Sequence, residues 1–555
     1  MKLRSDRNVT RRRPRGRPVN APGDKATRTE WRRMDLALRR ASTYPHPAGR
    51  VVRIETHISV LYLVGRYAYK ICKPVNLSFV DFTTREARYR SCRDALRLNR
   101  RLAASLYLGV VPIVRIGRTF RIGAVGAPFD HALKMRRFDE RDTLSALVAR
   151  GALRAAHVDR VAARLALFHA AASCHAPSAS LGSAKLVREQ LEDVLASLER
   201  NTPFTVPHGA ANWCRNEIAR LGEHIDSRRD DGFVRECHGD LHLDNMVSRN
   251  GDIVIYDCIE FSDALRWIDV TADIAFVVMD LLARERGDLA IRFLNKWLAS
   301  TGDFPGLAAL RLYVVYRALV RMLVTALKKH GRAHDIGDMS AYGRYRRLVD
   351  HLITPPTTFL ILCHGFSGSG KSVASEALTQ HIGAIRICSD VERKRIRGTL
   401  TLPKAHAARS CAYTREAIDA NYARLRAISD ALLSAGYPVV VDASFLKRVH
   451  RASFIELATS RSIAVFIADF RADVTVLVER LNRRAMHIGE PSDADERVLR
   501  RQLAELDPLT SAEAALTVAI DTEVSLDSFE RRAFWHPLLE RLGASCGWLT
   551  APGYC

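Results

Sequence analysis

The chain lacks any run of about 18 consecutive apolar residues, and it shows no short apolar segment of the kind found in signal peptides. These absences argue against a membrane partner and predict a cytoplasmic location. Its 11 cysteines stand singly, without the C-x-x-C spacing of a zinc site, which favours reduced, mostly buried thiols over a disulfide framework. No internal repeat of fixed period is visible either.

The sequence is long and carries a large positive net charge. At 555 residues it exceeds what one hydrophobic core supports, so two or more domains are expected. The net charge is +24, but residues 1–53 hold 16 Lys and Arg against 4 Asp and Glu, which is half of that excess. Residues 1–30 lack apolar periodicity and are predicted to be a disordered basic tail. This tail either contacts anionic polymers, the only route to nucleic acid that we expect, or is an inert extension.

A proline pair flanked by threonines marks a linker at residues 354–358, between a domain of residues 31–353 and a domain of residues 359–545. Before the linker, strand-like segments are confined to about 50–125 and 233–257, and helical patterns fill the remainder. This layout predicts an α+β domain with a β-rich small lobe and a helical large lobe. After the linker, short apolar runs alternate with helical stretches, which predicts an α/β domain with a parallel, doubly wound sheet.

The first chemical signature is the stretch Cys-His-Gly-Asp-Leu-His-Leu-Asp-Asn at residues 237–245, followed after an apolar strand by Asp257. Phosphoryl transfer requires a carboxylate that accepts the hydroxyl proton, oxygen ligands for magnesium, and cations that contact the phosphates. Asp240 is predicted as the catalytic base, and Asn245 and Asp257 as the Mg²⁺ ligands. Each residue alone would be read as part of a turn or a strand end, but the combination at this spacing favours catalysis. His238 is expected to hold the loop.

The second signature is Gly-Phe-Ser-Gly-Ser-Gly-Lys-Ser, which fits the phosphate-loop (P-loop) pattern G-x-x-x-x-G-K-[ST] completely. It follows an apolar segment that predicts a strand and precedes a helical pattern, which is the context that the motif requires. The loop residues predicted to bind ATP are Gly365, Phe366, Ser367, Gly368, Ser369 and Gly370. Lys371 is predicted to reach the β and γ phosphates, and Ser372 is predicted to bind both ATP and Mg²⁺. One chain therefore carries two unlike ATP signatures.

Residues 238–245 together with 257–261 resemble the aminoglycoside phosphotransferase-like branch of the protein-kinase-like fold. Segments 55–59, 96–102 and 265–269 are similar to bacterial proteins described as bifunctional aminoglycoside phosphotransferase and ATP-binding proteins, which also carry a C-terminal P-loop domain. The similarity extends from about residue 31 onward. It implies a protein-kinase-like domain joined to a P-loop NTPase domain.

The resemblance also implies an ATP-anchoring lysine on a small-lobe strand. Lys70 is the first choice and Lys73 the alternative, because residues three apart in a regular strand face opposite sides. The acidic partner of this lysine would stand on the next helix, but the family-like position near Ala95 is not acidic. Asp94 or Glu86 would have to substitute for it.

Further P-loop residues are predicted from resemblance to small P-loop kinases. The Ser-Asp-Val-Glu-Arg segment at 389–393 implies that Asp390 faces an acceptor hydroxyl as a catalytic residue. Asp442, which ends a Val-Val-Val run, is predicted to complete the Mg²⁺ shell, with a plain strand-ending carboxylate as the alternative. Arg480 and Arg484 are predicted as ATP-binding lid arginines, with a solvated basic helix face as the alternative.

These features predict a phosphotransferase with ATP and Mg²⁺ as cofactors and two ATP-binding modules, which phosphorylates the hydroxyl group of a small molecule. One alternative makes the P-loop half the main kinase, acting on a nucleotide sugar or a nucleic-acid end. Another makes one module a non-catalytic ATP-binding regulator, for which the missing acid near Ala95 is the sequence hint.

Overall fold

The computed structural model describes residues 25–77, 80–201, 206–329, 336–396, 414–485, 495–543 and 547–550. The chain forms two compact units, one made of the residues up to 140 together with 255–266, and the other of 141–254 and everything after 266. Helix α1 (Lys25–Leu38) begins inside the segment predicted as a basic tail. The rest of that segment, up to residue 24, lies outside the described residues.

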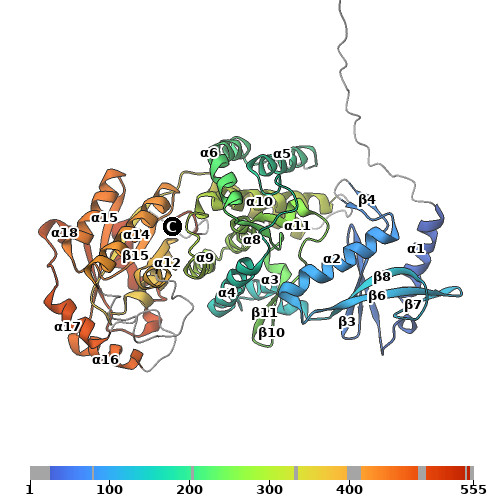
Figure 1. The fold of residues 1–555 in the computed structure, drawn as a ribbon, viewed down its shortest axis with the longest axis horizontal. Helices are drawn as coiled ribbons and strands as arrows, with labels where there is room; N and C mark the ends of the chain where they lie inside the picture. Colours follow the sequence, from blue (N-terminus) through green and yellow to red (C-terminus); the bar gives the residue numbers. More distant parts are fainter. Residues whose placement is uncertain are drawn as a thin grey trace, which may run out of the picture. The chain divides into compact units, whose positions relative to one another are not determined.

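The first unit is built on a six-stranded antiparallel sheet with the order β1-β2-β3-β8-β6-β7 (Figure 1). Its strands are β1 (Val51–Glu55), β2 (Ser59–Val64), β3 (Tyr67–Cys72), β6 (Tyr107–Ile116), β7 (Thr119–Ile122) and β8 (Pro128–Arg136). Buried side chains alternate along the strands, as in β2, because one face of the sheet packs on a core that includes Tyr62, Tyr69 and Ile113. A short ribbon of β4 (Asn76–Leu77) and β5 (Val80–Asp81) stands apart from the sheet.

Helix α2 (Arg85–Ala103) packs against β6 and β8 of this sheet. It begins where it does because the Thr84 side chain accepts a hydrogen bond from the N–H of Ala87, which satisfies one of the free donors of the first turn. The later segment 255–266, which ends in α7 (Asp263–Arg266), returns to this unit. Asn99 of α2 holds it, because its Oδ1 accepts a 2.9 Å bond from the N–H of Cys258.

The second unit begins with a helical region around α8 (Val270–Ala283), in which all 14 residues are buried. The other helices of this region are α3 (Leu144–Ala149), α4 (Ala155–Ala171), α5 (Ala184–Asn201), α6 (Ala210–Asp230), α9 (Gly287–Thr301), α10 (Leu307–Lys329) and α11 (Ile336–Leu352). Short strand pairs, β9 (Val234–Glu236) with β12 (Trp267–Asp269) and β10 (Met246–Arg249) with β11 (Asp252–Ile255), flank the loop of residues 237–245. The side chain of Asp269 caps α8 by accepting from the N–H of Thr271 at 2.7 Å.

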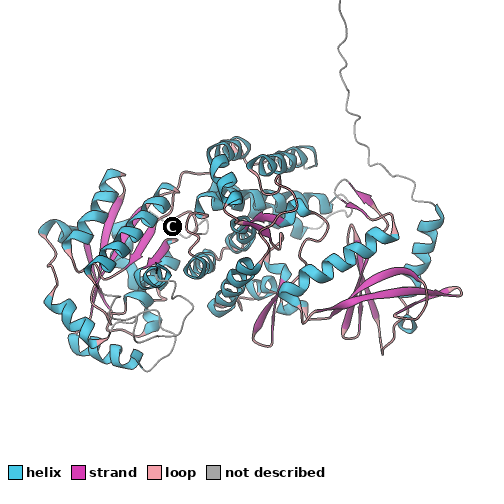
Figure 2. Ribbon diagram, viewed as in Figure 1, coloured by secondary structure: helices cyan, strands magenta, loops and turns pink. Residues whose placement is uncertain are grey.

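The second unit also contains a five-stranded parallel sheet with the order β14-β15-β13-β16-β17. Its strands are β13 (Phe359–His364), β14 (Ile385–Cys388), β15 (Val439–Asp442), β16 (Ala464–Arg471) and β17 (Thr517–Asp521). Helices connect successive strands (Figure 2): α12 (Lys371–Ile382), α13 (Ser389–Ile396), α14 (Arg415–Ser434), α15 (Arg448–Ser460), α16 (Val474–Ala485), α17 (Glu496–Ala504) and α18 (Ser511–Ala515). β13 is buried along its whole length, as expected for a central parallel strand.

No helix within the described ranges combines the length and the apolar character that crossing a membrane requires.

Candidate active sites

The first site gathers around Lys70 on β3 and the segment that carries Asp257. Nζ of Lys70 donates to Oδ1 of Asp257 at 3.1 Å. Lys73 follows the strand and bonds instead to Oε1 of Glu55 at 2.9 Å and to the carbonyl of Thr56 at 2.8 Å. Of the two lysines that the sequence offered, Lys70 is therefore the one that lies beside the predicted metal ligand.

Asp257 is held in a constrained backbone conformation. Its φ of +64° lies in the left-handed region, which residues other than glycine rarely adopt. Its N–H donates to the hydroxyl of Tyr107 at 3.2 Å, and the next N–H is the one held by Asn99. The carboxylate remains half exposed, with 51% of the side chain accessible. Hydrogen bonds to Tyr107 and Asn99 thus fix the backbone at Asp257, while its carboxylate stays accessible to a ligand.

Glu260 is a neighbour of Lys70 to which the sequence pattern assigned no role. Its Oε1 lies 3.6 Å from Nζ of Lys70, and only 6% of its side chain is exposed. Burial raises the pKa of Glu260, and the nearby Lys70 ammonium opposes this shift. Burial alone would lower the pKa of Lys70, but Asp257 and Glu260 raise it well above its ordinary value, so the lysine is a cation. The acid partner of Lys70 therefore comes from the Asp257 segment. No bond from Glu86 or Asp94 to Lys70 occurs among the described contacts.

The loop of residues 237–245 brings Asp240, His242 and Asn245 together in the second unit. Nδ2 of Asn245 donates to the carbonyl oxygen of Asp240 at 3.0 Å and to its Oδ2 at 3.1 Å. Nε2 of His242 lies 3.3 Å from Oδ2 of Asp240, and Nδ1 of His242 lies 3.4 Å from Oδ2 of Asp244. Because Asn245 uses its nitrogen here, its side-chain oxygen is the atom it can offer to a metal ion.

The charges of this loop are mutually stabilised. Burial alone would raise the pKa of Asp240, but the imidazole of His242 lowers it to about 2. Burial alone would lower the pKa of His242, but Asp240 and Asp244 raise it to about 9. The hydrogen bond from His242 also lowers the pKa of Asp244. At neutral pH Asp240 is therefore an ionised carboxylate beside a protonated imidazole.

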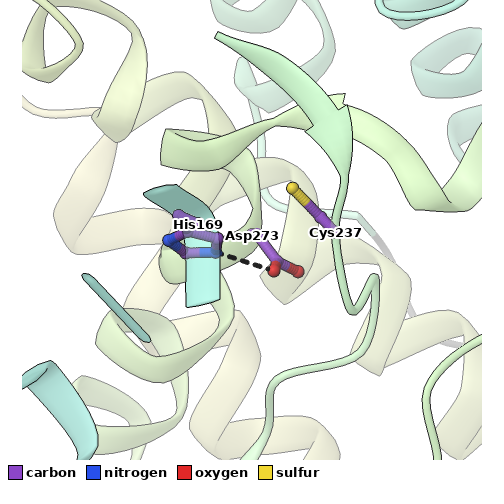
Figure 3. Close-up of side chains that lie close together, drawn as sticks. All are labelled: His169, Cys237 and Asp273. Carbon is purple, nitrogen blue, oxygen red and sulfur yellow. Dashed lines mark hydrogen bonds and ion pairs between the residues drawn. The ribbon is translucent and has the colours of Figure 1, made fainter. Parts of the chain in front are cut away.

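A buried cluster beneath the loop, shown in Figure 3, consists of His169, Cys237 and Asp273. Oδ2 of Asp273 contacts Nε2 of His169 at 3.1 Å and accepts from the N–H of His238 at 3.1 Å, while its Oδ1 accepts from the N–H of Gly239 at 2.8 Å. One donor atom from each side chain lies within 4.8 Å of the others, a spacing that a metal ion would also need. Because loop N–H groups occupy both oxygens of Asp273, the cluster anchors the loop of residues 237–245.

The P-loop joins β13 to α12 in the arrangement that the motif requires. Gly368 has φ of +87°, and a Cβ there would lie 2.8 Å from the carbonyl oxygen of Leu477, so only glycine fits. Gly370, with φ of +78°, is the N-cap of α12, whose first residues are Lys371 and Ser372. Nζ of Lys371 donates to the carbonyls of Gly365 and Phe366 at 2.8 and 2.6 Å, so it lies along the loop that it is predicted to serve.

A helix outside the motif also contacts the loop. The N–H of Ser367 donates to Oε1 of Gln502 on α17 at 2.8 Å. Leu499 of the same helix is buried in a cluster with Leu477 and Leu481 of α16, against which Phe366 packs. No motif points to Gln502, and its role at the loop could not be found from sequence spacing.

Asp442 ends β15 in the strand next to the P-loop strand, as predicted, but its carboxylate has a cationic partner. Arg386 of β14 donates from Nη2 to Oδ2 of Asp442 and from Nε to Oγ of Ser375 at 2.9 Å. In the parallel register Arg386 is paired with Val440, two positions before Asp442, so the side chains of Arg386 and Asp442 lie on the same face of the sheet. Arg386 thus occupies one carboxylate oxygen of the predicted metal ligand, and the other oxygen is the one that a metal shell would use.

A cavity of about 750 Å³ lies beside the P-loop. Asp390 lines it and pairs with Nη2 of Arg393 at 2.8 Å. Arg480 also lines it, held by two bonds to Thr522. Arg483 pairs with Glu479 on the exposed face of α16 at 3.0 Å. The side chain of Arg484 lies outside the described residues.

Two protein families match the chain. Residues 64–313 match the model of the family described as "Phosphotransferase enzyme family", and residues 360–509 match that described as "AAA domain". Together with the parallel five-stranded sheet, these matches confirm the predicted fold classes of both halves and the resemblance that the sequence suggested. The first match spans the segment from β2 into α10, and the second begins in β13.

The chain is also similar to particular proteins. Proteins of Mycobacterium tuberculosis and Mycobacterium bovis, both described as uncharacterized, are 29% identical over 455 residues, which is 79% of this chain and 87% of theirs. A gluconokinase from Sinorhizobium meliloti is 26% identical over 34% of this chain and 95% of its own, with a TM-score of 0.24. A choline/ethanolamine kinase family protein from Mesorhizobium loti is 14% identical over 58% of this chain and 96% of its own, with a TM-score of 0.34.

Proposed function

We propose that this chain, in which a domain of the phosphotransferase enzyme family precedes an AAA domain, transfers the γ-phosphoryl group of ATP to a hydroxyl group of a small molecule. The observation that carries the proposal is the bond between Lys70 and Asp257. It joins a cation suited to nucleotide phosphates to a half-exposed carboxylate suited to a divalent ion, and both are held by buried neighbours.

Asp240 is the proposed catalytic base. Its low pKa keeps it ionised at neutral pH, and 32% of its side chain is exposed, so an acceptor hydroxyl can reach it. In the proposed reaction the acceptor oxygen bonds to the γ-phosphorus, the bond from that phosphorus to the β,γ-bridging oxygen breaks, and ADP leaves. The hydroxyl proton passes to Asp240. His242 holds this carboxylate in place.

Asn245 and Asp257 are the proposed magnesium ligands of the first module. Each, within its own unit, offers an oxygen donor of the kind that Mg²⁺ prefers: Asn245 its side-chain oxygen and Asp257 a half-exposed carboxylate. When bound, such an ion would neutralise charge on the nucleotide phosphates. We assign the same preference to the P-loop module, where the hydroxyl of Ser372 and the second carboxylate oxygen of Asp442 would be the donors. A cytoplasmic location remains part of the proposal.

The P-loop module is proposed as a second ATP site. Residues 367–372 of its loop line a cavity large enough for a nucleotide, together with Asp390 and Arg480. This cavity favours the second candidate, in which the P-loop half is the main kinase and Asp390 faces its acceptor. Arg484 keeps its proposed lid role without a structural argument.

A purely regulatory first module is less well supported. The hint for it was the missing acid near Ala95, and Glu260 supplies a carboxylate to Lys70 from another segment. A lysine that keeps its orienting carboxylate can align a nucleotide for transfer.

One assay tests the proposal: label from γ-phosphate-labelled ATP is followed into a pool of small metabolites, with the wild-type chain, Asp240→Asn and Lys371→Ala. We expect the wild-type chain to transfer label. Asp240→Asn should abolish this transfer, and Lys371→Ala should retain most of it. Loss in Lys371→Ala alone would make the P-loop half the kinase. Transfer that survives both substitutions would contradict the proposal.

A further inference from the structure

Helix α9 of the helical region packs against the P-loop module within the second unit. It contacts α12, the helix that starts at Lys371, and β14, the edge strand of the parallel sheet. These contacts are made by residues that precede the P-loop module in the sequence by about 60 positions or more. The sheet edge that β14 would otherwise expose is therefore covered by another region of the chain.

Asn295 of α9 pairs with β14 as a neighbouring strand would. Its Oδ1 accepts from the N–H of Arg386 at 2.9 Å, and its Nδ2 donates to the carbonyl of Ala384 at 3.1 Å. The same Nδ2 lies 3.4 Å from Oγ1 of Thr379 on α12. A single carboxamide thus satisfies the outward-facing N–H of Arg386 and the carbonyl of Ala384, the residue directly before β14.

The side chain of Arg386 connects β14 to Asp442, the proposed metal ligand of the P-loop site. Its guanidinium bonds to Asp442 and to Ser375, and its Nη1 lies 3.9 Å from Glu376. Asp442 is buried, so its carboxylate has little freedom once Arg386 is fixed. Residues that orient a metal ligand from behind commonly change metal affinity or activity by about 10- to 100-fold when they are removed.

Other contacts of α9 act on the same module. Lys296 donates to Oε2 of Glu376 at 2.9 Å. Arg292 lies 3.2 Å from Oε1 of Glu376 and donates two hydrogen bonds to Asp159 of α4. At the other end of α9, Arg395 of α13 donates to the carbonyl of Ala299 at 2.7 Å. Helix α13 also carries Asp390, so α9 contacts the metal side and the acceptor side of the P-loop site.

We propose that Asn295 is a positioning residue of the P-loop site: through Arg386 it sets the carboxylate of Asp442, so the P-loop module is completed by a helix of the phosphotransferase region. This inference rests on the proposed function of that module. It assigns no chemical step to Asn295, which acts only by fixing β14.

The test compares Asn295→Ala in two full-length backgrounds. In the Asp240→Asn background, binding of a fluorescent ATP analogue to the P-loop module is titrated with Mg²⁺. The binding that is lost on adding Lys371→Ala is the part assigned to this module. In Lys371→Ala, phosphoryl transfer by the Asp240 loop is followed. Amide hydrogen exchange of β14 is measured in both. Ser300→Ala, on the exposed side of the same helix, is the matched control.

We expect Asn295→Ala to raise the Mg²⁺ concentration required for binding about tenfold and to speed exchange at Arg386, with transfer in the Lys371→Ala background unchanged within about twofold. Asn295→Asp, which keeps the acceptor for Arg386 but loses the donor to Ala384, should give a smaller change and tests the idea even if the alanine variant folds poorly. Ser300→Ala should change nothing.

Unchanged Mg²⁺ dependence, or unchanged exchange of β14, would overturn the inference. Equal losses in both backgrounds would also overturn it. The ring of Trp297 on α9 contacts the ring of His169, so a general defect in the packing of α9 would affect the Asp240 loop as well as the P-loop module. Absence of any Lys371-dependent ATP binding in the Asp240→Asn parent would reject the P-loop site itself. Lys371-dependent binding that ignores Asn295 would reject only the positioning role.

Discussion

Nζ of Lys70 donates to Oδ1 of Asp257 at 3.1 Å, across 187 positions of sequence. This bond ties a strand of the six-stranded sheet to the segment that returns after β11. It brings together an ammonium group of the kind that contacts nucleotide phosphates and a carboxylate of the kind that ligates a phosphate-bound metal ion.

Lys70→Met should lower kcat/KM of phosphoryl transfer by about 10²- to 10³-fold, because it removes the cation beside Asp257 and keeps the apolar length of the side chain. Steady-state kinetics in the Lys371→Ala background measure this. Lys73→Met is the matched control, since Lys73 bonds to Glu55 and not to Asp257. Equal losses in the two variants would show that Lys70 has no special role.

Glu260→Gln should lower kcat/KM about tenfold, mainly through a higher KM for ATP, because Lys70 then keeps only Asp257 as an anionic partner. The comparison variant is Glu55→Gln, which removes a carboxylate from Lys73. Initial rates measured over a range of ATP concentrations give the KM for ATP of both variants. A Glu260→Gln enzyme with wild-type KM would remove Glu260 from the site.

Asp273→Asn should destabilise the helical region, because its new amide would face the N–H groups of His238 and Gly239 in a buried site. We expect a loss of roughly 3 kcal/mol, or a melting temperature lower by roughly 6–12 °C. Scanning calorimetry checks this against Asp288→Asn, which removes a partly exposed partner of Arg286. Equal melting temperatures for the two variants would contradict the anchoring role of Asp273.

The ion pair of Arg451 and Glu513, joined at 2.7 Å, should make the stability of the fold depend on pH in acid. Burial alone would raise the pKa of Glu513, but Arg451 and Thr510 lower it to about 2 from its ordinary value of 4.5. A depressed folded-state pKa means that the pair stabilises the fold fully above pH 4.5 and loses this contribution as the pH falls toward 2. The stability difference between wild type and Glu513→Gln should therefore shrink below about pH 4.5.

Chemical denaturation at several pH values between 6 and 3.5 measures that difference. Glu479→Gln, which removes an exposed partner of Arg483, is the control and should show a small difference at every pH. A wild-type advantage over Glu513→Gln that stays constant down to pH 3.5 would be inconsistent with the account.

The sequence predicted what is local and missed what is distant. The P-loop and the loop of residues 237–245 are continuous motifs whose glycines and polar residues act within a few positions of each other, so spacing alone identified them. The fold classes followed from the order of strands and helices, which the hydrophobic pattern carries. Strand β8 lies wholly beyond the segment of about 50–125 where strands were expected, because its pairing with β3 and β6 is set by the tertiary fold.

Glu260 was missed because its partner Lys70 is far away in sequence and the acid was sought on the helix after β3. A signal existed: Glu260 stands three residues after Asp257. The bond between Arg386 and Asp442, 56 positions apart, depends on the register of β14 and β15, and the cover that Asn295 gives to β14 depends on packing between regions. Neither follows from spacing.

One chain with two separate nucleotide sites should bind two nucleotides, and the number bound is the most direct test. Equilibrium dialysis with a non-hydrolysable ATP analogue and Mg²⁺ should give two bound molecules per wild-type chain. It should give one for Lys371→Ala, one for the double variant Lys70→Met with Asp257→Asn, and none when all three substitutions are combined. A wild-type chain that binds a single nucleotide, or a Lys371→Ala chain that still binds two, would contradict the account.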